Sequence, residues 1–286
     1  MTASFVDIKE QFDQHFHSFI KKRYGTKDPL SQACSYALEG EGKRVRPLLV
    51  LLSNQACGGK ITEALDVAVA VEMVHTYSLV HDDLPICDND DLRRGRPTVH
   101  IKFDPATALL CGDALLSDAF TLLTNSPCPQ ALAMVRELSL AIGGKGMVLG
   151  QMMDLMATGH AQELTQLDMI HAHKTGKLIG SACALGGHAA KASQEVIKHL
   201  RQFGESIGLA FQIKDDLLDD EIGTGKSLGK DQKQGKLTYR GIMSRQKAEH
   251  KARDLTAQAV DLLASLDTGK KKPLLHFVET LLQRKR

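Results

Sequence analysis

The chain has 286 residues, 43% of them hydrophobic and 24% charged, and its 36 Lys and Arg against 34 Asp and Glu leave a formal net charge of +2. This length allows a sizeable core, and the composition excludes a disordered or fibrous chain. A charge so near zero excludes a whole-molecule field that attracts nucleic acid or anionic lipid. We therefore expect no nucleic-acid partner, and any function based on charge must come from local clusters.

The N-terminus does not read as a targeting segment, because Asp7 and Glu10 interrupt the apolar run that a signal peptide needs. No stretch approaches 18 apolar residues without a charge or amide, so we expect no membrane span and a cytoplasmic protein. The six cysteines show no C-x-x-C pair and no zinc or disulfide spacing, which predicts reduced thiols.

Apolar residues recur at helical spacing along nearly the whole chain, beginning with Phe5, Ile8, Phe12, Phe16 and Phe19. Glycine and proline divide the chain into helix-sized pieces, and period-two alternation is scarce. The segments 66–80 and 177–190 are apolar on most sides, which is typical of helices in the middle of a bundle. The pattern predicts one all-α domain over residues 1–286 with about ten or more helices.

Three basic runs are candidate anion sites. The first, Gly42-Lys43-Arg44-Val45-Arg46-Pro47, precedes an apolar helix whose first residue we expect to be Pro47. Basic side chains and free backbone N–H groups at a helix start suit phosphate. The other two runs are Arg93-Arg94 and the segment that contains Lys226 and Lys236.

The first acidic cluster runs from His81 to Asp91 and concentrates five aspartates. Asp82 and Asp88 are six residues apart, which is about 240° around an ideal helix, so they cannot share one helical face. Pro85 supplies a break that can bring them together at a helix end.

The second acidic cluster is Asp215, Asp216 and Asp219, whose spacing places them on one helical face. Like charges at this spacing destabilise a helix by about 0.2–0.5 kcal/mol per pair. A solvated surface explains one cluster well. Two clusters, each at the C-terminal end of an apolar helix where the dipole disfavours anions, instead favour a bound cation. Oxygen-only ligands suit Mg²⁺ held together with substrate phosphates.

Taken in order, these motifs resemble the trans-isoprenyl diphosphate synthase family, specifically its short bacterial farnesyl diphosphate synthase branch. The matching motifs span residues 40–239: G-K-R-x-R-P, D-D-x4-D with Arg93 and Arg94, G-Q-x-x-D at Gly150, Gln151 and Asp154, K-T-G at 174–176, D-D-x-x-D, and G-K-x-T-Y at 235–239. The resemblance implies an all-α bundle around a central cavity, a homodimer, and head-to-tail condensation of isopentenyl diphosphate with dimethylallyl and geranyl diphosphate to farnesyl diphosphate.

The resemblance also implies residue roles. Isopentenyl diphosphate would be held by Lys43, Arg46, His75 and Arg94. The allylic diphosphate would be bound through Mg²⁺, three ions per site with substrate present, on Asp82, Asp88 and Asp215, with direct contacts from Arg93, Lys174, Gln212, Lys226 and Lys236. Thr175 would lie beside the reacting carbons, and Asp83, Asp216 and Asp219 would complete the metal shells directly or through water.

Product length is expected to depend on Tyr77, five residues before the first motif, and on the neighbouring Ser78. An aromatic residue there resembles the C15 producers of the family, whereas a geranylgeranyl diphosphate synthase is the alternative product class. Two other classes stay open. His81-Asp82 in an all-α chain suggests an HD-type metal phosphohydrolase, and the same fold could serve as a non-catalytic synthase subunit.

Overall fold

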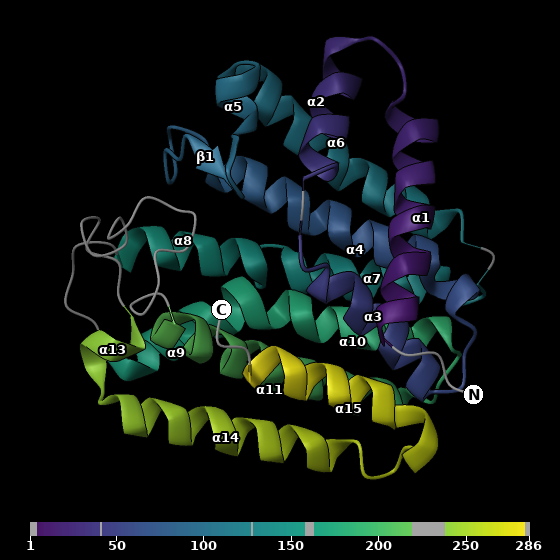
Figure 1. Ribbon diagram of the computed structural model, residues 1–286, viewed down its shortest axis with the longest axis vertical. Coiled ribbons are helices and arrows are strands. Elements are labelled where there is room, and N and C mark those ends of the chain that lie inside the picture. The colour runs from purple at the N-terminus through teal and green to yellow at the C-terminus, as the bar shows by residue number, and fades with distance from the viewer. Residues whose placement is uncertain (1–4, 41, 127, 158–162, 219–237, 284–286) are drawn as a thin grey trace.

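The computed structural model describes residues 5–40, 42–126, 128–157, 163–218 and 238–283 (Figure 1). Its first half contains α1 Phe5–Tyr24, α2 Pro29–Leu38, α3 Val45–Ala56, α4 Ile61–Asp82, β1 Leu92–Arg93, β2 Arg96–Pro97, α5 Val99–Lys102, α6 Pro105–Thr124 and α7 Ala131–Ile142. The second half contains α8 Met147–Ala157, α9 Leu164–His171, the π-helical turn η1 Ala172–Gly176, α10 Lys177–Ala189, α11 Gln194–Leu218, α13 Tyr239–Ile242, α14 Arg245–Leu262 and α15 Thr268–Gln283. The described residues thus confirm an all-α bundle of more than ten helices.

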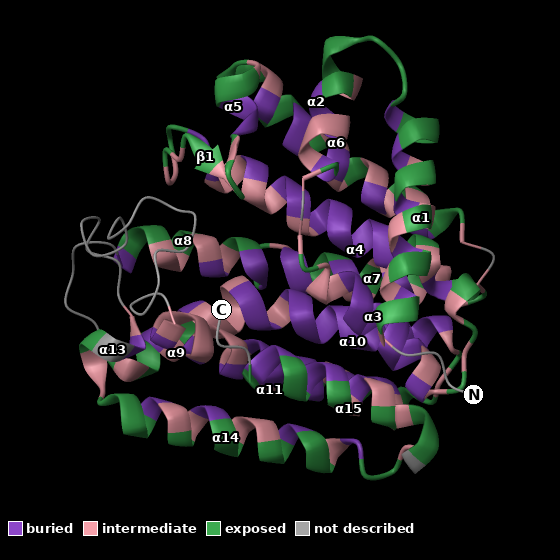
Figure 2. Cartoon of the chain, in the orientation of Figure 1, coloured by how far each residue is buried: buried purple, intermediate pink, exposed green. Residues whose placement is uncertain are grey.

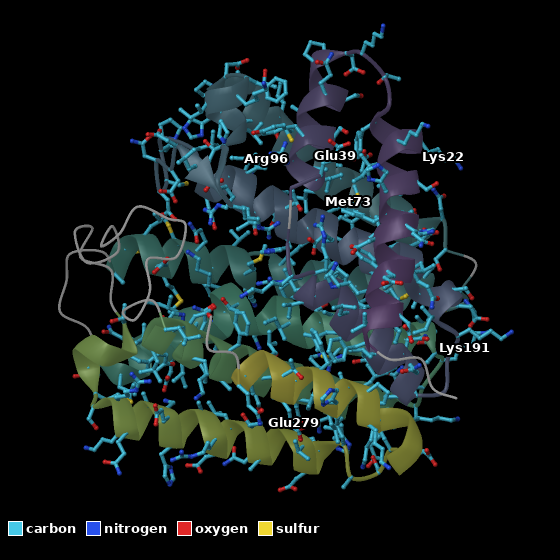
Figure 3. All side chains as sticks on the ribbon, viewed as in Figure 1. Lys22, Glu39, Met73, Arg96, Lys191 and Glu279 are labelled. Carbon is cyan, nitrogen blue, oxygen red and sulfur yellow. The ribbon has the colours of Figure 1, made fainter. Side chains whose placement is uncertain are left out.

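The core is built around α3, α4 and α10, which pack against one another and contain long runs of buried residues (Figure 2). The segment 67–74 of α4 and the segment 178–189 of α10 are buried throughout. This confirms the two central helices expected from their apolar sequence. Figure 3 shows the contrast: Met73 of α4 lies inside the bundle, whereas Lys22 and Glu279 lie at its edge.

Each outer helix buries one face, and local side chains determine where it begins. In α1 the buried positions are Ile8, Phe12, Phe16, Ile20 and Tyr24, each four residues after the last. Asp28 and Asp104 cap α2 and α6 by accepting hydrogen bonds from the backbone N–H groups of Ser31 and Thr107. A proline follows each cap at the first helical position.

The start of α3 differs from the expectation that Pro47 would be its first residue. The helix begins at Val45, after Arg44 in a left-handed conformation with φ of 49°. Pro47 is therefore the third helical residue. Because the N–H groups in the first turn of a helix make no hydrogen bond within the helix, a proline, which lacks an N–H, is tolerated there as well.

The hairpin of β1 and β2 was not expected from the sequence. Arg93 pairs with Arg96 across it, and the two loop residues, Arg94 and Gly95, have φ of 53° and 74°. Two consecutive positive φ values are characteristic of a type I′ turn, which favours glycine at its second position. This hairpin follows the first acidic cluster directly and presents three arginines close together.

The six cysteines are all free, as expected. Among the described residues one helix, α6, is long and apolar enough to cross a membrane, and 33% of its most apolar window is buried. It packs against α4 and α2, and its Asp118 accepts hydrogen bonds from Arg23 and Tyr24 of α1. These contacts make α6 a helix of the bundle.

Candidate active site

The first acidic cluster folds into a loop at the end of α4. The helix ends at Asp82, three residues before Pro85, and the backbone N–H of Asp88 then donates to the Asp82 carbonyl at 2.8 Å. Asn89 reverses the chain with φ of 49°. Asp82 and Asp88 both line one cavity of about 580 Å³. The break at Pro85 therefore brings these two carboxylates together, as predicted.

The second acidic cluster faces the same cavity. Asp215 and Asp216 lie in the last turn of α11 and line this space, which we call the carboxylate cavity. Burial raises the pKa of Asp82 to about 6; Lys174 opposes that rise and the nearby Asp88 adds to it. Two carboxylate clusters that are remote in sequence thus line one cavity, and the like charge of Asp88 beside Asp82 favours a bound cation there. The third member of the second cluster, Asp219, lies outside the described residues.

The K-T-G motif forms the π-helical turn between α9 and α10. Lys174 donates through Nζ to Asp154 Oδ2 at 2.6 Å, and Thr175 Oγ1 donates to Gln212 Oε1 at 3.2 Å. A side chain at Gly150 would place its Cβ 2.1 Å from the Lys174 backbone nitrogen, so only glycine lets α8 approach this turn. The G-Q-x-x-D and K-T-G segments therefore form one wall of the carboxylate cavity, and the π-helical turn marks it as functional.

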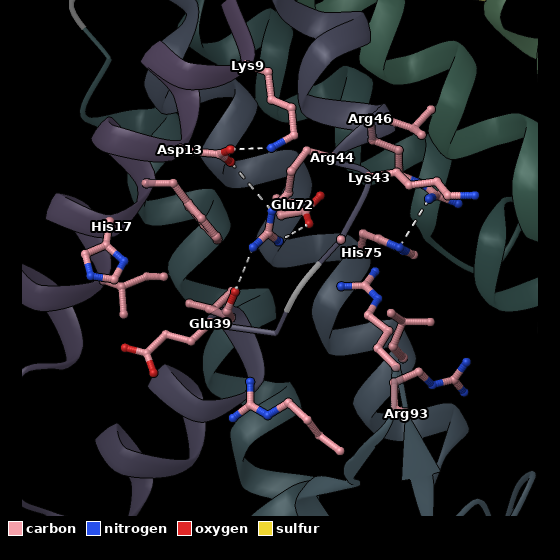
Figure 4. A pocket seen from close by; sticks show the side chains of 18 of the residues that line it. Lys9, Asp13, His17, Glu39, Lys43, Arg44, Arg46, Glu72, His75 and Arg93 are labelled. Atoms are coloured by element: carbon pink, nitrogen blue, oxygen red, sulfur yellow. Dashed lines mark hydrogen bonds and ion pairs between the residues drawn. The ribbon is translucent and has the colours of Figure 1, made fainter. Parts of the chain in front are cut away.

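A second, larger pocket of about 1300 Å³ adjoins the carboxylate cavity (Figure 4). We call it the arginine pocket, because its lining includes Lys43, Arg44, Arg46, Arg93, Arg94 and Arg96, together with His75. Arg46 Nη1 lies 3.2 Å from His75 Nε2. Burial lowers the pKa of Arg46 to about 10, and burial together with Arg46 lowers the pKa of His75 well below its ordinary value. The imidazole is therefore neutral and accepts from the guanidinium, in a pocket suited to a multiply charged anion.

Arg44 has a structural role in this pocket. Its Nη1 donates to the buried Glu72 at 2.6 Å, its Nη2 donates to the carbonyl of Gly40 at 3.0 Å, and its guanidinium lies 4.8 Å from the Phe16 ring centre. These contacts hold the left-handed residue before α3 and fix the segment that carries Lys43 and Arg46. Lys43 and Arg46 are thereby placed at the pocket, where the sequence motif predicted an anion site.

The carboxylate of Asp83 is paired with Arg93. Asp83 is buried, and both of its carboxylate oxygens accept hydrogen bonds from Arg93 Nε, at 3.0 and 3.3 Å. Asp83 does not line the carboxylate cavity, whereas Arg93 lines both spaces. The Asp83 carboxylate therefore orients Arg93, and its place in the metal shell stays a prediction.

Tyr77 and Ser78 both line the carboxylate cavity, together with Met147, Met152 and Leu155 of α8. Tyr77 is 6% exposed and contacts His81 edge to face, with ring centres 5.7 Å apart. This apolar end of the cavity is where a hydrocarbon tail would fit. His81 itself points to α6, where Nε2 lies 3.0 Å from the Leu109 carbonyl oxygen. That contact disfavours His81 as the ligand of an HD-type metal site.

Two buried polar side chains of the cavity received no role in the sequence analysis. His171 Nε2 and both polar atoms of Gln151 are buried without a hydrogen-bond partner, and both residues line the cavity. Burial lowers the pKa of His171 to about 4. His171 lies close in sequence to the K-T-G motif, which could have drawn attention to it. The position of His171 in a helical segment, however, does not reveal that its side chain faces Asp216.

The carboxylates fit Mg²⁺ by their chemistry: hard oxygen donors with one pKa raised by burial and mutual charge. Among the residues that the structure describes, no three His, Cys, Asp or Glu side chains group closely enough to hold a metal by themselves. Lys226, Lys236 and Asp219 lie outside the described residues.

Comparison with known proteins supports this arrangement. The polyprenyl synthetase profile matches residues 27–276. A farnesyl diphosphate synthase of Micrococcus luteus is 41% identical over 254 residues, covering 87% of each chain. A crystal structure of an FPP/GFPP synthase from Zymomonas mobilis matches with a TM-score of 0.87 at 34% identity, covering 97% of this chain and 98% of that one.

A Helicobacter pylori geranyltransferase complexed with magnesium and isoprenyl diphosphate matches with a TM-score of 0.83 at 32% identity over 99% of both chains. Membership of one protein family therefore explains the order of the motifs, the helical bundle and the two facing carboxylate clusters. This chain belongs to the polyprenyl synthetase family.

Proposed function

We propose that this protein is a Mg²⁺-dependent prenyltransferase that joins isopentenyl diphosphate head to tail to dimethylallyl and then geranyl diphosphate, releasing diphosphate and ending at farnesyl diphosphate. One observation carries the proposal: the carboxylate cavity and the arginine pocket share a wall made of Arg46, His75, Leu79, Arg93 and Asp215. Two anionic substrates can therefore bind side by side. The similarity to farnesyl diphosphate synthases supports the product class.

The two spaces suit different substrates. The allylic diphosphate would bind in the carboxylate cavity, where Asp82, Asp88 and Asp215 would hold its metal ions and the apolar side chains of α8 would receive its tail. Isopentenyl diphosphate would bind in the arginine pocket, whose lining includes the cations Lys43, Arg46 and Arg94. This division places the C5 double bond next to the reacting allylic carbon.

The chemistry needs charge stabilisation and positioning rather than a nucleophilic side chain. Bound Mg²⁺, which we expect as three ions per site, stabilises the negative charge that develops on the departing diphosphate. Lys174 and Arg93 add fixed positive charge to the same wall. Thr175 and Gln212, joined by a hydrogen bond of 3.2 Å, line the same cavity and would lie beside the allylic cation, from which the buried wall would exclude water. The double bond of isopentenyl diphosphate then attacks the cation, and a proton leaves to the released diphosphate.

Product length rests on Tyr77. Its buried ring lies against His81 in the lining of the cavity, and we expect it to stop elongation at a C15 chain. A geranylgeranyl diphosphate synthase would need a more open floor at this position.

The protein works as a homodimer in the cytoplasm. Support for a second copy comes from α6 and from α5 and α7, each of which contacts α6. These helices expose large apolar side chains: Ile101, Leu109, Leu110, Leu132 and Leu140 are each 48–82% exposed. A surface of this kind marks an interaction site. Sedimentation of the purified protein checks the dimer.

The function is tested by incubating the protein with labelled isopentenyl diphosphate, each allylic primer and Mg²⁺, followed by chromatography of the dephosphorylated products. We expect C15 alcohol, and none without Mg²⁺. Diphosphate release in the absence of isopentenyl diphosphate would instead indicate a phosphohydrolase. No product from the protein alone, but stimulation of a second synthase, would indicate a non-catalytic subunit.

A further inference from the structure

Tyr239 is the centre of a buried network behind the second acidic cluster. Its side chain is fully buried, and its hydroxyl donates to Asp168 Oδ1 at 2.6 Å. Lys251 of α14 pairs with the other oxygen of Asp168 and lies 5.7 Å from the centre of the Tyr239 ring. Three helices, α9, α13 and α14, therefore fix the ring in one place.

Two groups reach from this network to Asp216. The Tyr239 backbone N–H donates to Asp216 Oδ2 at 2.9 Å. The His171 ring stacks on the Tyr239 ring with centres 5.5 Å apart and planes 22° apart, and its Nε2 lies 3.9 Å from the same oxygen. That Nε2 is buried and has no hydrogen-bond partner. Both groups thus lie close to the same oxygen of Asp216, whose carboxylate lines the cavity.

We propose that Tyr239 and His171 are positioning residues for Asp216. The Tyr239 amide donates to Oδ2, and the His171 ring, stacked on the Tyr239 ring, holds its Nε2 3.9 Å from the same oxygen and so limits the orientations that this carboxylate can take beside bound metal ions. The inference rests on the proposed function. It follows the general rule that carboxylates which bind metals are themselves held by outer hydrogen bonds, whose loss costs about 10- to 100-fold in affinity.

The chain contains a matched control for this network. Tyr24 donates through its hydroxyl to Asp118 Oδ2 at 2.7 Å, Arg23 pairs with the same carboxylate at 2.6 Å, and the Arg23 guanidinium lies 5.8 Å from the Tyr24 ring centre. Chemistry and burial resemble those around Tyr239, but neither Tyr24 nor Asp118 lines the two substrate spaces. Tyr24→Phe therefore loses the same kind of hydrogen bond without touching the site.

The first test measures binding without turnover. The full chain is titrated with Mg²⁺ in the presence of inorganic diphosphate, and the midpoint of the rise in Tm is recorded. We expect Tyr239→Phe and His171→Phe to raise the Mg²⁺ midpoint by about tenfold. His171→Gln, which can place an amide nitrogen near the position of Nε2, should recover most of the loss. Tyr24→Phe should lower Tm but leave the midpoint unchanged. Equal midpoints for the parent and both Tyr239→Phe and His171→Phe overturn the inference.

The second test measures directly the hydrogen bond between the Tyr239 backbone N–H and Asp216. Amide hydrogen exchange at Tyr239 should be protected in the parent and faster by about tenfold in Asp216→Ala, because the acceptor is removed. Unchanged protection in Asp216→Ala refutes this hydrogen bond. This measurement needs neither metal nor substrate. If the parent makes no C15 product, only the proposed function fails. The exchange result by itself decides whether Tyr239 positions Asp216.

Discussion

The backbone N–H of Asp88 donates to the carbonyl oxygen of Asp82 at 2.8 Å, and this bond closes the loop that places two carboxylates six residues apart on one cavity wall. A continuous helix would have turned them to different faces. The helix end at Asp82 is therefore part of the site, because it converts a sequence motif into a pair of neighbouring oxygen donors.

Removing a carboxylate from either cluster should abolish turnover without unfolding the protein. We expect Asp82→Ala and Asp215→Ala each to lower kcat by about 1000-fold or more, because each loses an oxygen that faces the metal ions. Steady-state assays with Mg²⁺, together with circular dichroism, check this. Asp254→Ala, on the outer helix α14, is the control. Activity within a few fold of the parent would show that these aspartates do not hold the metal.

The metal-free protein should lose stability as the pH rises through the range in which Asp82 ionises. Its pKa is raised from 3.8 to about 6, so the folded state holds the proton more tightly than the unfolded state, and this contribution favours folding at low pH. Above about pH 6 the charged carboxylate destabilises the fold. Asp82→Asn should therefore be more stable than the parent at pH 7.5 by about 1–2 kcal/mol, with partial solvent exposure reducing the effect. Urea unfolding without metal measures the difference, which should vanish near pH 4; a constant difference would contradict it.

Two lysines should separate the substrates. Lys43 lines only the arginine pocket, and Lys174 lines only the carboxylate cavity. Lys43→Ala should raise KM for isopentenyl diphosphate by about tenfold with little change for geranyl diphosphate, and Lys174→Ala should do the reverse, since each loses one charge-assisted contact. Initial rates with each substrate varied in turn test this pair. Both variants affecting the same substrate would refute the assignment of the two spaces.

Asp83→Asn should weaken catalysis without changing the Mg²⁺ requirement. The substitution breaks the ion pair that orients Arg93, so we expect kcat/KM to fall by about 10- to 100-fold. Because Asp83 does not line the carboxylate cavity, the Mg²⁺ concentration for half-maximal rate should match that of the parent. A large rise in that concentration would place Asp83 in the metal shell.

Opening the floor of the cavity should lengthen the product. Tyr77→Ala removes a buried ring, at a cost of about 3–5 kcal/mol in stability, and we expect C20 or longer products from it. Tyr77→Phe keeps the ring and should still stop at C15. Chromatography of the dephosphorylated products at a temperature where both variants remain folded distinguishes them. If Tyr77→Ala stops at C15, another residue forms the floor.

Much of the site could be read from the chain because its chemistry is written in short motifs. The carboxylates of the two clusters, Lys43 and Arg46 were identified by residue type and spacing, and the K-T-G segment by the family resemblance; the structure brings the described ones to two adjoining spaces. The apolar segments 66–80 and 177–190 likewise predicted the central helices, since a helix without a polar face has to be buried.

Other features depended on contacts that no local pattern contains. The role of Asp83 was predicted from its motif, but its carboxylate turns toward Arg93 because the type I′ hairpin brings that arginine back over the end of α4. His171 and Tyr239 are 68 positions apart. The sequence singled out Tyr239 only as the last residue of the G-K-x-T-Y motif and His171 not at all; their stacking beside Asp216 gives them a role. The sequence by itself determined which charges and oxygens the protein can use, because those properties belong to single residues. The tertiary structure decided which of them face the same cavity, because orientation depends on packing between helices distant in the chain.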